Sequence, residues 1–166
     1  MKLLLDSTYL IPALNVDILE GWSKEDLKKL IQSERFELYY CDLSLFEIYT
    51  KCMRLIIDQK LKVKIETVQT GIQSILNSPK IFKINWWENI FESEILLEFK
   101  KIHNDSIDCL LLYLAIINCD MFATFDITFI NKIKKSDNIK QFIQEINPQF
   151  RILLNNLTQE SIYLFE

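Results

Sequence analysis

Glycine is scarce in this chain of 166 residues, which contains only Gly21 and Gly71. Neither glycine stands in a GxGxxG or GxxxxGK(S/T) motif, the glycine-rich loops that hold phosphate groups in nucleotide-binding folds. The absence of these motifs makes most cofactor-dependent enzymes poor candidates.

The chain also has only one histidine and no closely spaced pair of cysteines. The only histidine, His103, lies in the polar segment KKIHND, where we expect a solvated side chain, and Ser-His-Asp chemistry would have to depend on it. The cysteines show no CxxC spacing and stand in apolar surroundings, so we expect small buried side chains in a reducing compartment and neither a zinc site nor disulfides. They are Cys41, Cys52, Cys109 and Cys119.

Long apolar runs are missing as well. No run approaches the roughly 20 residues that span a bilayer, and the segment MKLLLDSTYL reaches an aspartate too early for a signal peptide. These absences predict a cytoplasmic protein that does not bind membranes. The net charge of −4 argues against a protein that coats polyanions, but it leaves room for a local basic patch.

The rest of the composition predicts one globular domain over residues 1–166, with 49% hydrophobic and 25% charged residues. Short apolar runs predict strands near residues 2–6, 36–42, 80–87, 119–126 and 149–154. Helical spacing predicts helices within 22–33, capped by Ser23, and within 43–76, 88–101, 105–118 and 129–147, with a break near 60–64. Alternating strands and helices predict an α/β fold whose parallel sheet has helices on both faces.

Four acidic residues fall at one edge of this predicted sheet. Asp6 and Asp126 directly follow the first and fourth strands, at the carboxyl ends where open parallel sheets bind ligands. Asp108 stands at the start of the helix that precedes the fourth strand, and Glu47 lies within the first turn of the helix after the second strand. We therefore expect four carboxylates from distant segments to converge.

Each of these acids also has a purely structural interpretation. Asp6 can cap the next helix, Asp108 can favour the helix dipole, and Asp126 can start a turn. Glu47 can form a surface ion pair with Lys51, four residues later. Four independent caps have no reason to share one edge, however, so the convergence favours a common site.

A cluster of carboxylates requires a cation to offset its repulsion, which is roughly 3 kcal/mol for a pair ~5 Å apart at an effective dielectric constant of 20. The donor set is all oxygen, which suits Mg²⁺ or Mn²⁺ better than zinc or copper. Such sites are widely used to activate water for attack on phosphodiester bonds. The pattern therefore predicts a metal-dependent phosphodiesterase.

At three places the sequence resembles the PIN-domain family. These are the opening LLLDSTYLI, the segment SLFEI around Glu47, and a D…A…TFD frame in which Asp108 and Asp126 enclose Ala115 and Thr124. The resemblance covers residues 1–154. It implies a three-layer α/β/α sandwich with a central five-stranded parallel sheet, and a Mg²⁺- or Mn²⁺-dependent endoribonuclease acting on single-stranded or structured RNA.

The resemblance also implies roles for particular residues. Its four acidic positions, which would be catalytic and metal-binding, are matched by Asp6, Glu47, Asp108 and Asp126. Thr8 and Ser44 match small polar positions that support the metal site.

The chain departs from the family's pattern at Thr128, where many members carry another acid. Asp105 is an extra acid that can compensate, although a solvated loop residue is the simpler interpretation. Two alternatives to a free-standing ribonuclease stay open: a toxin restrained by an antitoxin partner, and a non-catalytic module that binds RNA or protein. A homodimer is also possible.

Positive charge near the acids can bind the substrate. Lys51 and Arg54 follow Glu47 on the same side of its helix and are predicted to contact RNA phosphates. A second basic patch consists of Lys132, Lys134 and Lys135, for which a solvated helix face is the simpler interpretation. For the neighbouring pair Trp86 and Trp87, packing in or beside the core is the simpler interpretation.

Overall fold

The structure, a computed structural model, describes residues 1–16, 21–89, 94–154 and 161–164. These residues form one six-stranded sheet in the order β3-β2-β1-β4-β5-β6. All neighbouring strands are parallel except β6, which runs antiparallel to β5. The strands are β1 (Lys2–Leu5), β2 (Glu37–Cys41), β3 (Ile81–Ile84), β4 (Met121–Thr124), β5 (Arg151–Leu154) and β6 (Ser161–Leu164).

The predicted fold class is confirmed, because β1 to β5 form a five-stranded parallel sheet with helices on both faces. The strand β6 was not predicted. It is an edge strand, defined by its antiparallel register against β5, with Leu154 opposite Ser161.

From α2 onward the α-helices overlap the predicted segments, but β3 ends at Ile84 and Trp86 begins the 3-10 helix η2, so the end of the strand predicted over 80–87 is wrong. Ser23 caps α2 through a capping box with Asp26, and the break near residues 60–64 separates α3 from α4. Part of the helix predicted over 88–101 lies at residues 90–93, outside the described residues. The elements are α1 (Ser7–Leu10), η1 (Ile11–Leu14), α2 (Lys24–Gln32), α3 (Asp42–Ile57), α4 (Ile65–Leu76), η2 (Trp86–Asn89), α5 (Glu94–Ile102), α6 (Ser106–Asn118), α7 (Ile127–Ile133) and α8 (Asp137–Ile146).

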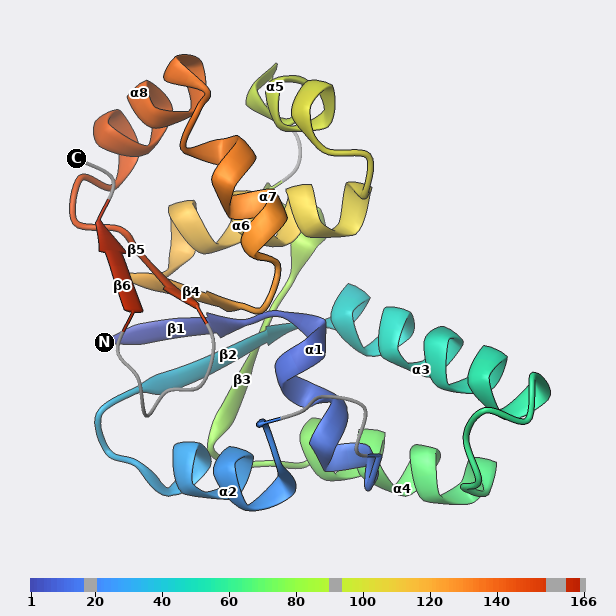
Figure 1. Cartoon of the computed structure of the whole chain (residues 1–166). Helices are drawn as coiled ribbons and strands as arrows, with labels where there is room; N and C mark the ends of the chain where they lie inside the picture. The colour runs from blue at the N-terminus through green and yellow to red at the C-terminus, as the bar shows by residue number, and fades with distance from the viewer. Residues whose placement is uncertain (17–20, 90–93, 155–160, 165–166) are drawn as a thin grey trace.

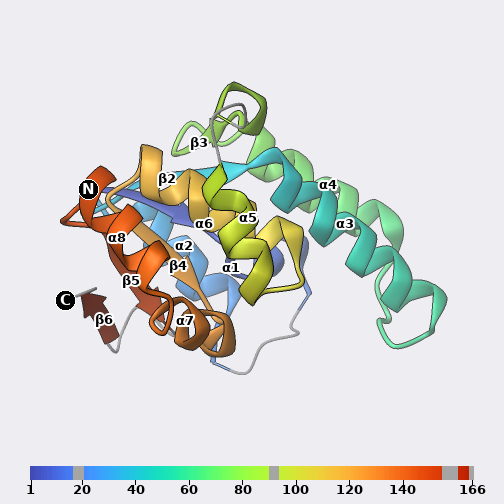
Figure 2. The same cartoon turned by 90° about the horizontal axis from the view of Figure 1, so that it is seen from above.

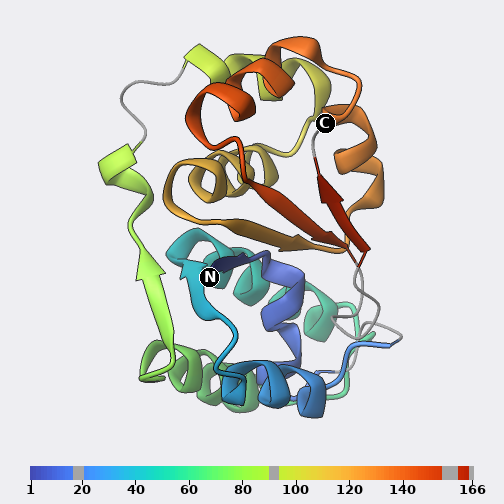
Figure 3. The ribbon, with the colours of Figure 1, turned by 90° about the vertical axis from the view of Figure 1, so that its left-hand side faces the viewer.

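The sheet separates two apolar cores, because successive side chains of a strand point to opposite faces. Leu4 packs in the core under α5 to α8, whereas Leu3 and Leu5 pack in the core with α1 to α4. Figures 1 and 3 show these two helical layers on either side of the strands. The four cysteines are free and buried, as predicted.

The side of the sheet on which successive strands are added changes after β3, with β1 at the centre. The strands β2 and β3 lie on one side of β1, and β4 and β5 lie on the other. The carboxyl ends of β1 and β4 therefore border the crevice in which open α/β sheets bind ligands. Figure 2 shows α6 and α7 above this part of the sheet, with α3 and α4 extending to one side.

Among the described residues, no helix is both long and apolar enough to cross a bilayer.

Candidate metal centre

Asp6 directly follows the central strand β1 and is almost fully buried. Its backbone N–H donates to the carbonyl oxygen of Ala123 at 2.9 Å, which ties the end of β1 to β4. Its side chain accepts hydrogen bonds from the hydroxyl groups of Ser7 (3.2 Å), Thr8 (3.0 Å) and Thr124 (2.9 Å). Burial raises the pKa of this carboxyl, and the three hydroxyl groups oppose that rise.

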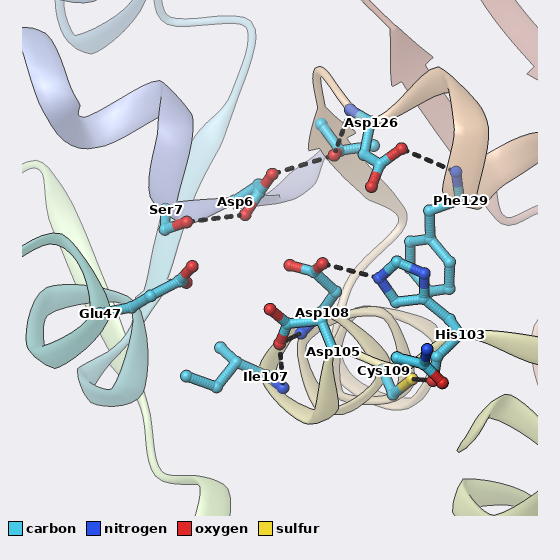
Figure 4. Close-up of polar contacts among 12 residues, drawn as sticks. Asp6, Ser7, Glu47, His103, Asp105, Ile107, Asp108, Cys109, Asp126 and Phe129 are labelled. Carbon is cyan, nitrogen blue, oxygen red and sulfur yellow. Dashed lines mark hydrogen bonds and ion pairs between the residues drawn. The ribbon is translucent and has the colours of Figure 1, made fainter. Parts of the chain in front are cut away.

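Asp126 is the N-cap of α7, whereas its structural interpretation was the start of a turn. One carboxylate oxygen accepts a hydrogen bond from the backbone N–H of Phe129 at 2.7 Å, which caps the helix. The backbone N–H of Asp126 in turn donates to the hydroxyl of Thr124 at 3.1 Å. The second carboxylate oxygen lies on the side of His103 and Asp108 in Figure 4. Capping therefore leaves half of this carboxylate available to a ligand.

Glu47 lies in the second turn of α3, so the prediction of a first-turn position is wrong. The helix begins at Asp42, directly after β2, and the Asp42 side chain accepts a hydrogen bond from the next backbone N–H, that of Leu43. Glu47 still faces the predicted edge, and Figure 4 shows its carboxylate pointing toward Asp6 and Asp108.

The predicted ion pair between Glu47 and Lys51 is present, but it does not lie on the surface. The Glu47 side chain is 7% exposed, against 53% for Lys51. Lys51 contacts one carboxylate oxygen of Glu47, and the other oxygen, Oε2, is buried without a hydrogen-bond partner among the described residues. An unpaired carboxylate oxygen is costly to bury, and a bound ligand would offset that cost.

Asp108 occupies the first turn of α6, between the other acids. Its carboxylate lies 2.9 Å from Nε2 of His103. The pKa of Asp108 is raised to about 6: burial is the largest cause, the charges of Asp6, Asp105 and Glu47 add to it, and the His103 contact opposes the rise. This carboxyl therefore combines burial with three nearby like charges.

The expectation that His103 is solvated is wrong. Its side chain is 14% exposed, and its ring stacks on that of Phe129 with centroids 4.3 Å apart. The cause is tertiary, since α7 covers the ring. The only local clue in the sequence was the short spacing from His103 to the helix that carries Asp108.

Asp105 is exposed, as expected, but it also has a structural role. It caps α6 by accepting hydrogen bonds from the backbone N–H groups of Ile107 (2.9 Å) and Asp108 (3.4 Å). This role places its carboxylate beside that of Asp108 in Figure 4.

Two groups of potential metal ligands meet at Asp108. One consists of Glu47, Asp105 and Asp108, and the other of Asp108, His103 and Asp126; in each, ligand atoms from all three residues lie within 4.8 Å of one another. Asp6 belongs to neither group, although its charge raises the pKa of Asp108. The four predicted acids thus share one edge, but their oxygens do not form a single close cluster.

The predicted supporting and substrate-binding residues lie around this edge. The Thr8 hydroxyl contacts Asp6, whereas the buried Ser44 hydroxyl finds no hydrogen-bond partner within the described part of the chain. Burial lowers the pKa of Lys51, but the carboxylates of Glu47, Asp6 and Asp108 outweigh it and the net shift is upward. Arg54 is exposed in the last turn of α3.

The remaining candidates have mixed surroundings. Trp86 is half-buried and stacks on the exposed Trp87 with ring centroids 3.6 Å apart. On and just after α7, Lys132 and Lys135 are exposed and Lys134 is half-buried.

Comparison with known proteins does not supply a family. No protein-family model matches the chain, and no curated protein matches it either.

Proposed function

We propose that this protein is a metal-dependent endoribonuclease of the PIN-domain type, with its site at the carboxyl edge of β1 and β4. The observation that carries the proposal is the buried Oε2 of Glu47, which has no hydrogen-bond partner among the described residues and belongs to a carboxylate aimed at Asp6 and Asp108. A divalent cation is the ligand that such an atom and its acidic neighbours accept best. The choice of RNA as substrate rests on the sequence resemblance.

The donor set fits Mg²⁺ or Mn²⁺. Glu47, Asp105 and Asp108 offer oxygens within 4.8 Å of one another, and ligands at opposite corners of an octahedral site lie about 4.2 Å apart. These three residues would hold the metal, which when bound would lower the pKa of a water molecule and neutralise charge on a phosphodiester.

The neighbouring residues would organise the site. Asp6, fixed by the hydroxyls of Ser7, Thr8 and Thr124, adds negative charge that attracts a cation to Asp108. Lys51 partly neutralises Glu47. The half-exposed side chain of Lys51 and the exposed Arg54, three residues later on α3, can direct their charged groups to the phosphates of a bound strand.

The test is cleavage of end-labelled RNA pools by the full chain in Mg²⁺ or Mn²⁺, compared with the Asp6→Asn and Asp108→Asn variants. The control is Glu98→Gln, which removes an acid from an ion pair on α5 with Lys101, away from the site. We expect metal-dependent cleavage by the wild type and the control, and its loss in both aspartate variants. RNA binding without metal-dependent cleavage would instead indicate a non-catalytic module.

A further inference from the structure

His103 lies at this edge, and the resemblance implies no role for it. A solvated histidine would need no explanation, but this ring is held from two sides. It stacks on Phe129, and its Nε2 lies 2.9 Å from Oδ2 of Asp108. Because His103 is the only histidine in the chain, any imidazole chemistry of this protein must come from it.

Phe129 links His103 to the acid on the other side. The ring of Phe129 packs on the imidazole, and its backbone N–H donates to Oδ1 of Asp126 at 2.7 Å. The first turn of α7 therefore positions a nitrogen ligand and an oxygen ligand together. Such prior positioning lowers the entropic cost of binding a third body between them.

The separation of His103 and Asp108 matches that of two ligands on an octahedral ion. Ligands about 2.1 Å from a metal lie about 3 Å apart at adjacent corners of an octahedron and about 4.2 Å apart at opposite corners. The 2.9 Å between His103 and Asp108 suits adjacent corners, and ligand atoms of His103, Asp108 and Asp126 lie within 4.8 Å of one another. One ion can thus replace the hydrogen bond between His103 and Asp108.

We infer that His103, Asp108 and Asp126 form a second metal position, which shares Asp108 with the first and selects Mn²⁺ over Mg²⁺. The inference rests on the proposed function. Imidazole nitrogen is a good ligand for transition metals, whereas Mg²⁺ prefers oxygen. The second position therefore differs in metal preference from the all-carboxylate position formed by Glu47, Asp105 and Asp108.

The structure also limits the strength of this ligand. Metal-binding histidines usually donate their other ring N–H to an acceptor that fixes the ring. Nδ1 of His103 is buried and has no such partner in the described ranges, so stacking on Phe129 must hold the ring. We expect His103→Gln to weaken Mn²⁺ binding roughly tenfold, the low end of the effects seen around metal sites, and to change Mg²⁺ binding by less than about twofold.

The decisive measurement is electron spin-echo envelope modulation of Mn²⁺ bound to the untagged full chain. A ¹⁴N coupling in the wild type, lost in His103→Gln, would establish imidazole coordination. Asp105→Asn is the matched control, because asparagine preserves the cap of α6 while changing only the first group. It should weaken both metals and keep the nitrogen signal.

The outcomes separate the inference from the proposed function. Mn²⁺ binding without a ¹⁴N coupling in the wild type would overturn the inference and leave the carboxylate site in place. No binding of either metal would overturn both. The wild-type spectrum decides the question even if His103→Gln fails to fold.

Discussion

The hydroxyl of Thr124 donates a hydrogen bond to Oδ2 of Asp6 across 118 residues of sequence, at a distance of 2.9 Å. The same hydroxyl accepts a hydrogen bond from the backbone N–H of Asp126. One buried side chain at the end of β4 thus joins two of the four predicted acids. It also gives the buried Asp6 one of its three hydroxyl donors.

Replacing Thr124 with valine should destabilise the protein by about 1–3 kcal/mol, because a buried acceptor and a backbone donor each lose a partner. Loss of this donor should raise the pKa of Asp6 further above 3.8. The destabilisation should therefore grow as pH rises and the carboxyl must ionise in the fold. Urea unfolding at pH 5 and pH 8 measures it. Thr124→Ser should restore most of the stability, and equal losses in both variants would contradict the role of the hydroxyl.

Asp108→Asn should stabilise the metal-free protein at neutral pH. The folded-state pKa is raised from 3.8 to about 6, so the unfolding free energy of the wild type should fall as pH rises through this range. The difference corresponds to at most about 3 kcal/mol. The gain from the variant should be present at pH 7.5 and smaller at pH 5, and it should be read from urea melts.

The same variant should lose the thermal stabilisation that Mn²⁺ gives the wild type. Asp137→Asn is the control, and its effect on stability should have the opposite sign. Lys140 lowers the pKa of Asp137, so removing the Asp137 charge should slightly destabilise the protein at neutral pH. If Mn²⁺ raises the melting temperature of Asp108→Asn as much as that of the wild type, Asp108 is not a ligand.

Glu47→Gln should reduce the single-turnover rate of RNA cleavage by a factor on the order of 10² or more, the scale of a positioned acid–base group. Excess Mn²⁺ should restore part of the rate. A surface ion pair would contribute only about 0.3 kcal/mol to stability and nothing to the rate. Cleavage at the wild-type rate across a Mn²⁺ series would remove Glu47 from the site, and Glu98→Gln provides the matched background.

Lys51→Ala and Arg54→Ala should weaken RNA binding and flatten its dependence on salt, since contacts to phosphates release counterions. Binding is measured by fluorescence anisotropy over a series of salt concentrations. Lys29→Ala is the control, because Lys29 pairs with Asp26 on α2 as Lys51 pairs with Glu47 on α3. If the salt dependence of RNA binding has the same slope in all three variants, Lys51 and Arg54 do not contact phosphates and lie on an ordinary solvated surface.

Gly71→Ala should destabilise the fold although alanine favours helices. A Cβ at Gly71 would lie 2.5 Å from Cα of Leu14 and 2.6 Å from the carbonyl oxygen of Ala13. Overpacking of this kind costs about 1–3 kcal/mol, more than the helix propensity returns. Thermal melting measures the effect, with Gln69→Ala on the same helix as the control. A higher melting temperature would show that α4 does not approach η1 this closely.

The sequence was sufficient to predict the sheet edge at which the acids meet. Asp6 and Asp126 closely follow short buried strands, and the carboxyl ends of parallel strands lie at one edge of the sheet. The turn that holds Glu47 was misjudged: the predicted start at residue 43 already makes Glu47 the fifth helical residue, beyond a first turn of about 3.6 residues, and the observed start at Asp42 makes it the sixth.

Local sequence could not predict the surroundings of His103. Its neighbours are polar, but its ring is covered by Phe129 from a helix that follows β4. The burial of Glu47 is likewise tertiary, since i,i+4 spacing to Lys51 occurs equally on exposed helices. Tertiary contacts therefore decided which polar residues became part of the site.

The central place of β1 in the sheet affects how the protein is made. This strand is synthesised well before β4, although the two are neighbours in the sheet. At translation rates of roughly 5–20 residues per second, the stretch from Asp6 to Asp126 takes roughly 6 to 24 s to synthesise. During that time the nascent chain lacks Asp126, and a chain truncated before that residue could never assemble the whole edge.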